Sequence, residues 1–130
     1  MKSGKHELII HININPYPQQ HEIHAAAMLA EYFDCDVQFI QRKINAKTLD
    51  LLIKGIRWEI KSPKGNAKNT IDNNLRKANR QSQYVVIDLS RTKMRAYQAK
   101  ARINAFLREG STKFKRILLI NKSGKVLEIL

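Results

Sequence analysis

The chain has 130 residues, 43% of them hydrophobic, which is enough for one modest core and too little for two ordinary domains. Its formal charge of +13 favours an anionic partner, nucleic acid first and an acidic membrane surface second. No apolar run is long enough to cross a bilayer, and a single cysteine cannot form an internal disulfide. We therefore expect one domain over residues 1–130 that works in solution, with nucleic acid and not a membrane as its partner.

The first third of the chain predicts a strand, a helix and a second strand. Residues Glu7–Ile14 are rich in β-branched side chains and stop at a turn that contains two prolines. Residues Gln20–Phe33 repeat apolar side chains at helical spacing, and Glu22 lies at the end of that apolar stripe. Residues Asp36–Gln41 have the composition of a strand.

Residues 49–61 predict a β-hairpin with the sequence LDLLIKGIRWEIK. A two-residue turn at Lys54-Gly55 supplies the positive φ that such turns need and pairs positions whose numbers sum to 109. Asp50 then faces Glu59 directly. Because side chains alternate along a strand, Trp58 and its apolar neighbours belong to one face and the two acids to the other.

The remaining elements alternate helix and strand. A helix begins at Asn69 or Thr70 and runs to about Arg80, and residues Gln83–Leu89 form a continuous apolar run suited to a central strand. A basic helix follows over Met94–Arg108, and the chain closes with a hairpin that turns at Ser123-Gly124. This order predicts a mixed α/β fold.

Two opposed carboxylates in a hairpin require a compensating charge. Directly opposed residues hold their Cβ atoms about 4.5–5.5 Å apart, and like charges there are destabilising. A divalent cation would offset the repulsion, and Lys61 on the same face would point at its bound water. Alternatively, Asp50 and Glu59 are solvent-facing strand residues, and Arg57 and Lys61 soften the repulsion as ordinary surface pairs.

The order of Asp50, then Glu59-Ile60-Lys61, with Glu22 on a preceding helix, resembles the PD-(D/E)xK nucleases of the restriction-endonuclease-like superfamily. The longer run WEIKSPKGNAKNTIDNNLRKANRQSQYVVIDL, residues 58–89, is similar to the C-terminal tRNA-nuclease domains of bacterial contact-dependent growth inhibition toxins. The resemblance covers roughly residues 20–90. It implies a restriction-endonuclease-like core, that is, a mixed central sheet flanked by helices.

The resemblance also implies a role for each motif position. Asp50 and Glu59 would coordinate Mg²⁺ or Mn²⁺, with the carbonyl of Ile60 as a third ligand. Lys61 would position or deprotonate the attacking water and stabilise charge in the transition state. Glu22 would complete the metal ligands directly or through water; alternatively, it is a helix N-terminal acid placed for the macrodipole.

Basic side chains near this motif predict a phosphate-binding track. Lys64 and Lys68 lie in a loop that leads into a helix N-terminus, where free N–H groups favour phosphate. Arg76, Lys77 and Arg80 extend the track along the polar face of that helix. A second cluster, over residues 91–116, has nine basic residues against one acid and predicts contact with a nucleic-acid backbone.

These observations favour a metal-dependent endonuclease that cuts tRNA as a bacterial competition toxin, with an immunity protein as a second partner. It would act in the bacterial cytoplasm, free-standing or delivered as part of a larger toxin. The same core acting on DNA in a phage or mobile element is a second hypothesis. A nucleic-acid-binding module without catalysis, in which the acidic pair is incidental, is a third.

Overall fold

The computed structural model describes residues 2–41 and 49–130. Its helices are α1 (Gln20–Phe33), α2 (Thr70–Asn79) and α3 (Ala96–Glu109). Its strands are β1 (Lys2–Ser3), β2 (His6–Ile9), β3 (Val37–Gln41), β4 (Leu49–Ile53), β5 (Ile56–Lys61), β6 (Tyr84–Asp88), β7 (Arg116–Ile120) and β8 (Val126–Glu128).

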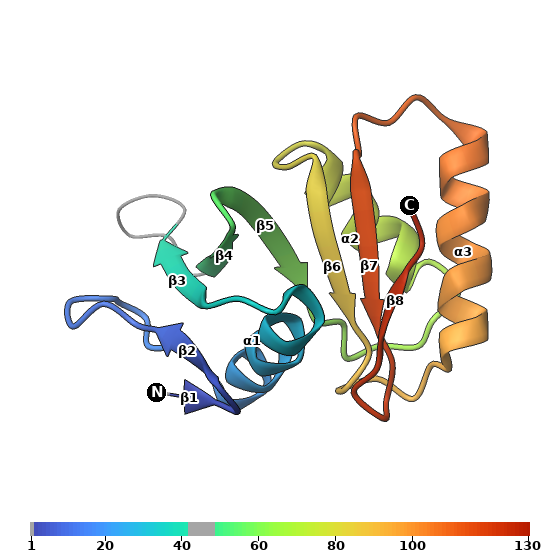
Figure 1. Ribbon diagram of the computed structural model, residues 1–130. Helices are drawn as coiled ribbons and strands as arrows, with labels where there is room; N and C mark the ends of the chain where they lie inside the picture. Colours follow the sequence, from blue (N-terminus) through green and yellow to red (C-terminus); the bar gives the residue numbers. More distant parts are fainter. Residues whose placement is uncertain (1, 42–48) are drawn as a thin grey trace.

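The described strands form one mixed sheet in which neighbours in the chain are neighbours in space, from β1 to β8 (Figure 1). The pairs β2–β3, β5–β6 and β6–β7 are parallel, and the others are antiparallel. Helix α2 makes the crossover from β5 to β6, as the sequence predicted. Strand β6 is therefore central between two parallel neighbours, which explains its continuous apolar run.

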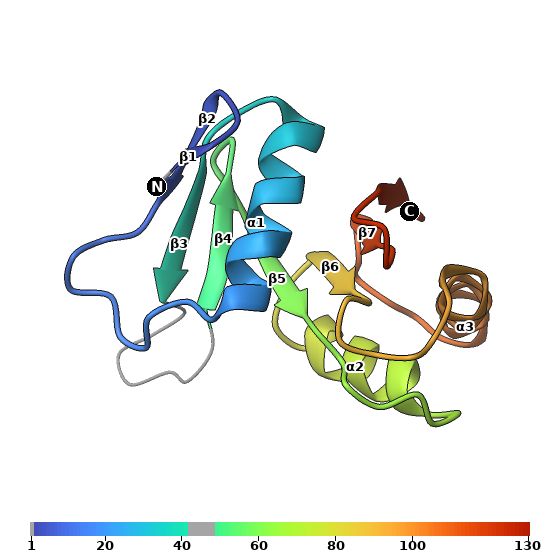
Figure 2. The same cartoon turned by 90° about the horizontal axis from the view of Figure 1, so that it is seen from below.

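Two separate cores lie on the two faces of this sheet. Alternate residues of β6 and β7 divide between them, so that Val86 and Leu118 pack with α1, while Val85 and Ile117 pack with α2 and α3. Seen from below, the sheet bends, with α1 on one side and the other two helices on the opposite side (Figure 2). The β4–β5 hairpin lies at this bend, between the two helical layers.

The start of the chain differs from the prediction. The predicted strand Glu7–Ile14 ends at Ile9, five residues early. A turn over residues 11–14 replaces its second half, because the amide of Ile14 bonds to the carbonyl of His11 and the amide of Asn13 bonds to the His11 ring, 3.1 Å away. Asparagine favours such turns, and this preference outweighed the β-branched composition. Strand β1, which pairs with β2, was not predicted.

The elements that frame the hairpin lie close to their predicted positions. Helix α1 has the predicted bounds, and α2 and β6 begin and end within one residue of theirs. The hairpin turn has φ of 51° at Lys54 and 79° at Gly55, as a two-residue turn of this type requires. Asp34 ends α1 with a φ of 53°, the left-handed conformation that glycine usually supplies.

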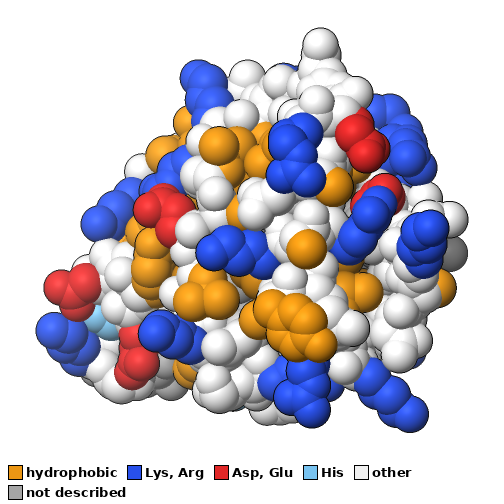
Figure 3. Space-filling model, turned by 90° about the vertical axis from the view of Figure 1, so that its right-hand side faces the viewer, with side chains coloured by type: hydrophobic (Ala, Val, Ile, Leu, Met, Phe, Trp, Pro, Cys, Tyr) orange, Lys and Arg blue, Asp and Glu red, His pale blue; other side chains and the backbone are white. Residues whose placement is uncertain are grey.

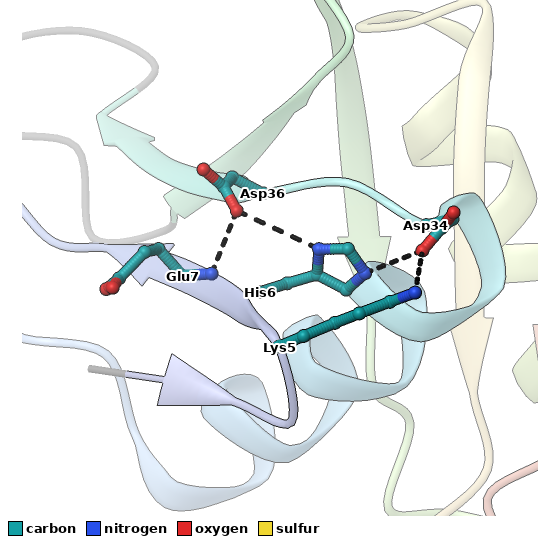
Figure 4. Close-up of polar contacts among 5 residues, drawn as sticks. All are labelled: Lys5, His6, Glu7, Asp34 and Asp36. Carbon is teal, nitrogen blue, oxygen red and sulfur yellow. Dashed lines mark hydrogen bonds and ion pairs between the residues drawn. The ribbon is translucent and has the colours of Figure 1, made fainter.

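A polar cluster ties β2 to the corner between α1 and β3 (Figure 4). The His6 ring lies between Asp34, whose carboxylate is 2.8 Å from Nε2, and Asp36, 4.0 Å from Nδ1. Lys5 places its ammonium group 3.3 Å from Asp34, and the amide of Glu7 donates to Asp36. The hydrogen bond from His6 lowers the pKa of Asp34, and Lys5 lowers it further.

Candidate functional site

The β4–β5 hairpin has the predicted register. Asp50 pairs with Glu59, Leu51 with Trp58 and Ile53 with Ile56. The predicted pairing of Thr48 with Lys61 lies outside the described residues. Asp50 and Glu59 therefore stand directly opposite each other and share one face of the sheet.

Both carboxylates are buried, each with 2% of its surface exposed. The alternative in which they face solvent is therefore wrong, because the strands lie inside the bend of the sheet and not at its rim. Lys61 places Nζ 2.9 Å from Oε1 of Glu59, and Arg57 places Nη1 3.6 Å from Oδ2 of Asp50. The two cations named in that alternative are present, but they pair with buried acids, where charges interact more strongly than at a surface.

Trp58 packs on the opposite face of the hairpin, as predicted. It is 1% exposed, and its ring lies 5.6 Å from that of Phe33 and 5.4 Å from that of Tyr84. The guanidinium of Arg116 lies 5.5 Å from the centre of the same ring. Each strand of the hairpin thus has a packed apolar face directly behind its acid, which holds the backbone of Asp50 and Glu59 in place.

A second feature opens at the carboxyl end of β5, and we call it the β5-end pocket. It has a volume of about 380 Å³, and its lining includes His21, Glu22, Lys61, Lys64 and Arg91. Glu22 lies here, in the first turn of α1, and its carboxylate accepts the amide of Gln19 at 2.7 Å. That contact is a capping-box hydrogen bond, and it comes with the first-turn position that the macrodipole alternative expected of Glu22.

Within residues 2–41 and 49–130, no three His, Cys, Asp or Glu side chains come together to hold a metal. Glu22 therefore does not join Asp50 and Glu59 in one set of side-chain ligands. Mg²⁺ is commonly held by only one or two carboxylates and keeps several waters, so the Asp50–Glu59 pair fits it without a third acid. Ile60 lies between Glu59 and Lys61 in β5, in register with Val86, and the role of its carbonyl remains a prediction.

The walls of the β5-end pocket are held by contacts between two strand ends. Arg91 donates to the carbonyl of Ser62 at 2.7 Å. Asp88, which is 1% exposed at the end of β6, accepts hydrogen bonds from Ser90 and a longer one from Ser62. Burial lowers the pKa of His21, and the Arg91 charge lowers it further, so this ring is neutral at pH 7.

The pocket contains residues that the sequence interpretation missed, chiefly His21 and Arg91. They come from segments far apart in the chain and share no motif. The signal that could have found Arg91 is its place directly after β6, because parallel strands such as β5 and β6 gather polar loop residues at their carboxyl ends.

The predicted phosphate-binding residues are all at the surface. Lys64 and Lys68 are exposed in the loop after β5, Arg76 and Lys77 are exposed on α2, and Arg80 is exposed directly after that helix. Thr92 anchors that loop, because its hydroxyl donates to the carbonyl of Gly65 at 2.8 Å. Only Lys64 lines the same pocket as Lys61, and the α2 cations lie beyond it on the surface.

No helix in the described part of the chain is long and apolar enough to span a membrane. A search of curated proteins gives no match. Among solved structures, a chain of the CdiA-CT/CdiI toxin and immunity complex from Burkholderia pseudomallei has the same fold, with a TM-score of 0.63 and 17% sequence identity. The match covers 94% of this chain and 97% of the other.

One family matches the sequence itself over residues 47–126, which is more than half of the chain, and it is described as the contact-dependent growth inhibition CdiA C-terminal domain. The matched region contains the β4–β5 hairpin, α2, β6 and α3. The resemblance to contact-dependent growth inhibition domains is thereby confirmed at the level of the family. The chain belongs to the CdiA C-terminal domain family of contact-dependent growth inhibition proteins.

Proposed function

We propose that this domain is a metal-dependent endonuclease of the PD-(D/E)xK type, with a restriction-endonuclease-like core, that hydrolyses phosphodiester bonds in tRNA. The observation that carries the proposal is the hairpin: Asp50 and Glu59 are opposed and buried, and Lys61 contacts Glu59. Buried charges are costly unless opposite charges or a coordinated metal ion compensate them. The choice of tRNA rests on the sequence resemblance of residues 58–89.

The residues divide the chemistry between them. Asp50 and Glu59 would hold Mg²⁺ or Mn²⁺, and a bound ion of this kind supplies positive charge at the phosphate and an activated water. Lys61 belongs to both features, because it pairs with Glu59 and also lines the β5-end pocket. A phosphate in that pocket would meet Lys61, Lys64 and Arg91, and their cationic groups would stabilise the charge that develops in the transition state.

The domain would act as the toxic part of a larger protein, inside the cytoplasm of a target bacterium. Membership of the CdiA C-terminal family supports delivery by a larger protein. The similar Burkholderia structure is a toxin and immunity complex, which supports a cognate immunity protein for this chain as well. With a charge of +13, this domain would be best matched by an acidic immunity protein.

Cleavage assays with single substitutions test the proposal. Purified protein is incubated with tRNA and with plasmid DNA, each with Mg²⁺ and with EDTA. We expect cleavage of tRNA with Mg²⁺ only. Lys61→Ala should lower the rate about 10²–10⁴-fold, the range for one acid–base group, and Glu59→Gln should lower it at least as much. Both variants should still bind tRNA in EDTA.

Matched controls come from charges at the opposite end of the sheet. Glu128→Gln on β8 and Lys125→Ala just before that strand make the same chemical changes at exposed positions. Both should keep full activity. Cleavage of plasmid DNA alone would favour the DNA hypothesis, and binding without any cleavage would favour the non-catalytic module. Undiminished cleavage by Glu59→Gln would remove the hairpin from the mechanism.

A further inference from the structure

A larger pocket lies away from the hairpin, between the loop after β5 and the start of α3, and we call it the α3 groove. Its volume of about 610 Å³ is within the range of about 300–1,000 Å³ that is usual for ligand sites. Its lining includes four basic residues, Lys68, Lys93, Arg95 and Arg102, together with Met94 and Tyr97, and no acidic residue. The side of the molecule that carries α3 shows many Lys and Arg side chains, with hydrophobic side chains exposed between them (Figure 3).

The charges of the groove are available to a ligand. Lys68, Lys93 and Arg95 are exposed, and no ion pair joins any of them to an acid in the described part of the chain. Arg102 differs, because it pairs with Asp72 on α2 at 2.7 Å and so fixes α3 against α2. The groove therefore combines one structural cation with three that can bind an anion.

The apolar parts of the groove are suited to a flat ring. Tyr97 is 70% exposed at the second position of α3, whereas Met94 is 6% exposed. The backbone there is well held, since the side chain of Gln98 accepts the amide of Arg95 at 2.9 Å and the hydroxyl of Thr92 accepts the amide of Met94. An exposed tyrosine on a helix is commonly only a surface residue, but this one borders a pocket with three available cations.

The groove and the β5-end pocket share one loop. Ser62 and Lys64 line the pocket, and residues 66–68 of the same loop line the groove. Arg91 and Thr92 hold this loop at Ser62 and Gly65, so its first half keeps a fixed position. A nucleic-acid backbone that leaves the β5-end pocket at Lys64 would reach Lys68 next. The pocket and the α3 groove would then form one continuous path for the backbone.

We propose that the α3 groove binds an unpaired nucleotide of the RNA substrate, with the base stacked on Tyr97 and the neighbouring phosphates at Lys68, Lys93 and Arg95. A base supplies the flat apolar face that Tyr97 needs, and its backbone supplies the anions. A paired base keeps its faces inside the helix and cannot stack there. The inference rests on the proposed function for the identity of the ligand, and it adds a preference for single-stranded segments near the cleaved bond.

Binding measurements in EDTA test the groove apart from catalysis. The probes are a fluorescently labelled single-stranded RNA of ten nucleotides and a ten-base-pair RNA duplex, followed by anisotropy. Stacking of one base is worth about 1–3 kcal/mol, so Tyr97→Ala should weaken single-strand binding about 5- to 140-fold. Tyr97→Phe keeps the ring and should stay within about twofold of wild type, a change of at most about 0.4 kcal/mol. Neither variant should change duplex binding.

Controls separate stacking from charge and from folding. Tyr32→Ala removes an aromatic ring of 40% exposure from α1 and should leave binding unchanged. The double variant Lys68→Ala/Lys93→Ala should weaken binding of both probes and reduce the slope of log K against log salt for the single strand by about 0.7 per lost phosphate contact. Equal loss of both probes by Tyr97→Ala, or no loss of either, overturns the proposal.

The outcome is separable from that of the proposed function. Tyr97-dependent binding of single-stranded RNA by a protein that cleaves nothing would support the groove and remove the nuclease. Cleavage that depends on Glu59, with single-strand binding unchanged in Tyr97→Ala, would support the nuclease and overturn the groove. If Tyr97→Ala instead weakens only the binding of an immunity protein, the groove is a protein interface and the RNA proposal is wrong.

Discussion

The β4–β5 hairpin and the α3 groove are built from similar residues and use them in opposite ways. Each combines one large aromatic residue with several charged ones. In the hairpin the aromatic residue, Trp58, and both acids are buried, whereas in the groove Tyr97 and three of the basic residues are exposed. Burial fixes geometry and strengthens charge interactions, as chemistry requires. Exposure leaves charges and rings open to a long, variable ligand.

The largest effect should come from removing the aromatic residue of each region in turn. Trp58→Ala should lower the free energy of unfolding by about 3–5 kcal/mol, because it empties a packed core behind the acids. Tyr97→Ala, its counterpart in the groove, should change it by less than about 0.5 kcal/mol. Urea unfolding followed by circular dichroism measures both. Comparable losses would show that Tyr97 belongs to the core and would break the comparison.

Metal binding should distinguish the two regions by a smaller effect. Mg²⁺ at about one hundred times its Kd should stabilise the wild-type protein by about 2.7 kcal/mol, seen as a rise in Tm over the protein in EDTA. Asp50→Asn should lose this rise, because it removes one of the two proposed metal ligands. Asp36→Asn on the surface and Tyr97→Ala in the groove should both keep it. A rise retained by Asp50→Asn would place the metal elsewhere.

The smallest effect should come from the polar cluster around His6. Asp34 there is exposed, and its contacts stabilise the fold and are not part of either proposed binding site. The pKa of Asp34 is lowered in the folded state from its usual 3.8 by the hydrogen bond from His6. Its carboxylate therefore stabilises the fold above that value, and the contribution is lost as the pH falls through the lower, folded-state pKa. Asparagine tolerates the left-handed backbone at this position. Asp34→Asn therefore removes only the charge, and it should lower Tm at pH 7 slightly.

The difference between Asp34→Asn and wild type should disappear in strong acid, where the wild-type carboxylate is protonated too. Thermal melts of the two proteins at several pH values between 7 and 2 give this comparison directly. A difference in Tm that stays constant across the range would assign the effect to shape at the corner after α1, and charge would then have no part in it.

The sequence predicted the hairpin in detail because its geometry is local. A two-residue turn at Lys54-Gly55 fixes every cross-strand pair, so the opposition of Asp50 and Glu59 follows from counting. The sequence could not predict that both acids are buried, because their burial depends on how the whole sheet bends. The alternation that placed Trp58 in the core is also local, and that prediction is confirmed.

Features made by distant segments were beyond sequence reasoning. The sequence predicted a basic helix near α3 but no site for an aromatic residue, because Tyr97 becomes notable only beside the loop of Lys68. His21 and Arg91 likewise meet Lys61 only through the sheet order. The overlong strand at Glu7–Ile14 has a different cause, since one turn-forming asparagine outweighed a run of β-branched residues.

The strictly sequential order of the strands has a consequence for how the domain gains its shape. Every strand pairs with the segment that precedes it in the chain, so no part must wait for a distant end to arrive. Each closure spans only the connection between neighbouring strands, and such a closure costs less entropy than one across the whole chain. A chain that emerges from its N-terminus onward can add each new strand to the edge of the strands that are already paired.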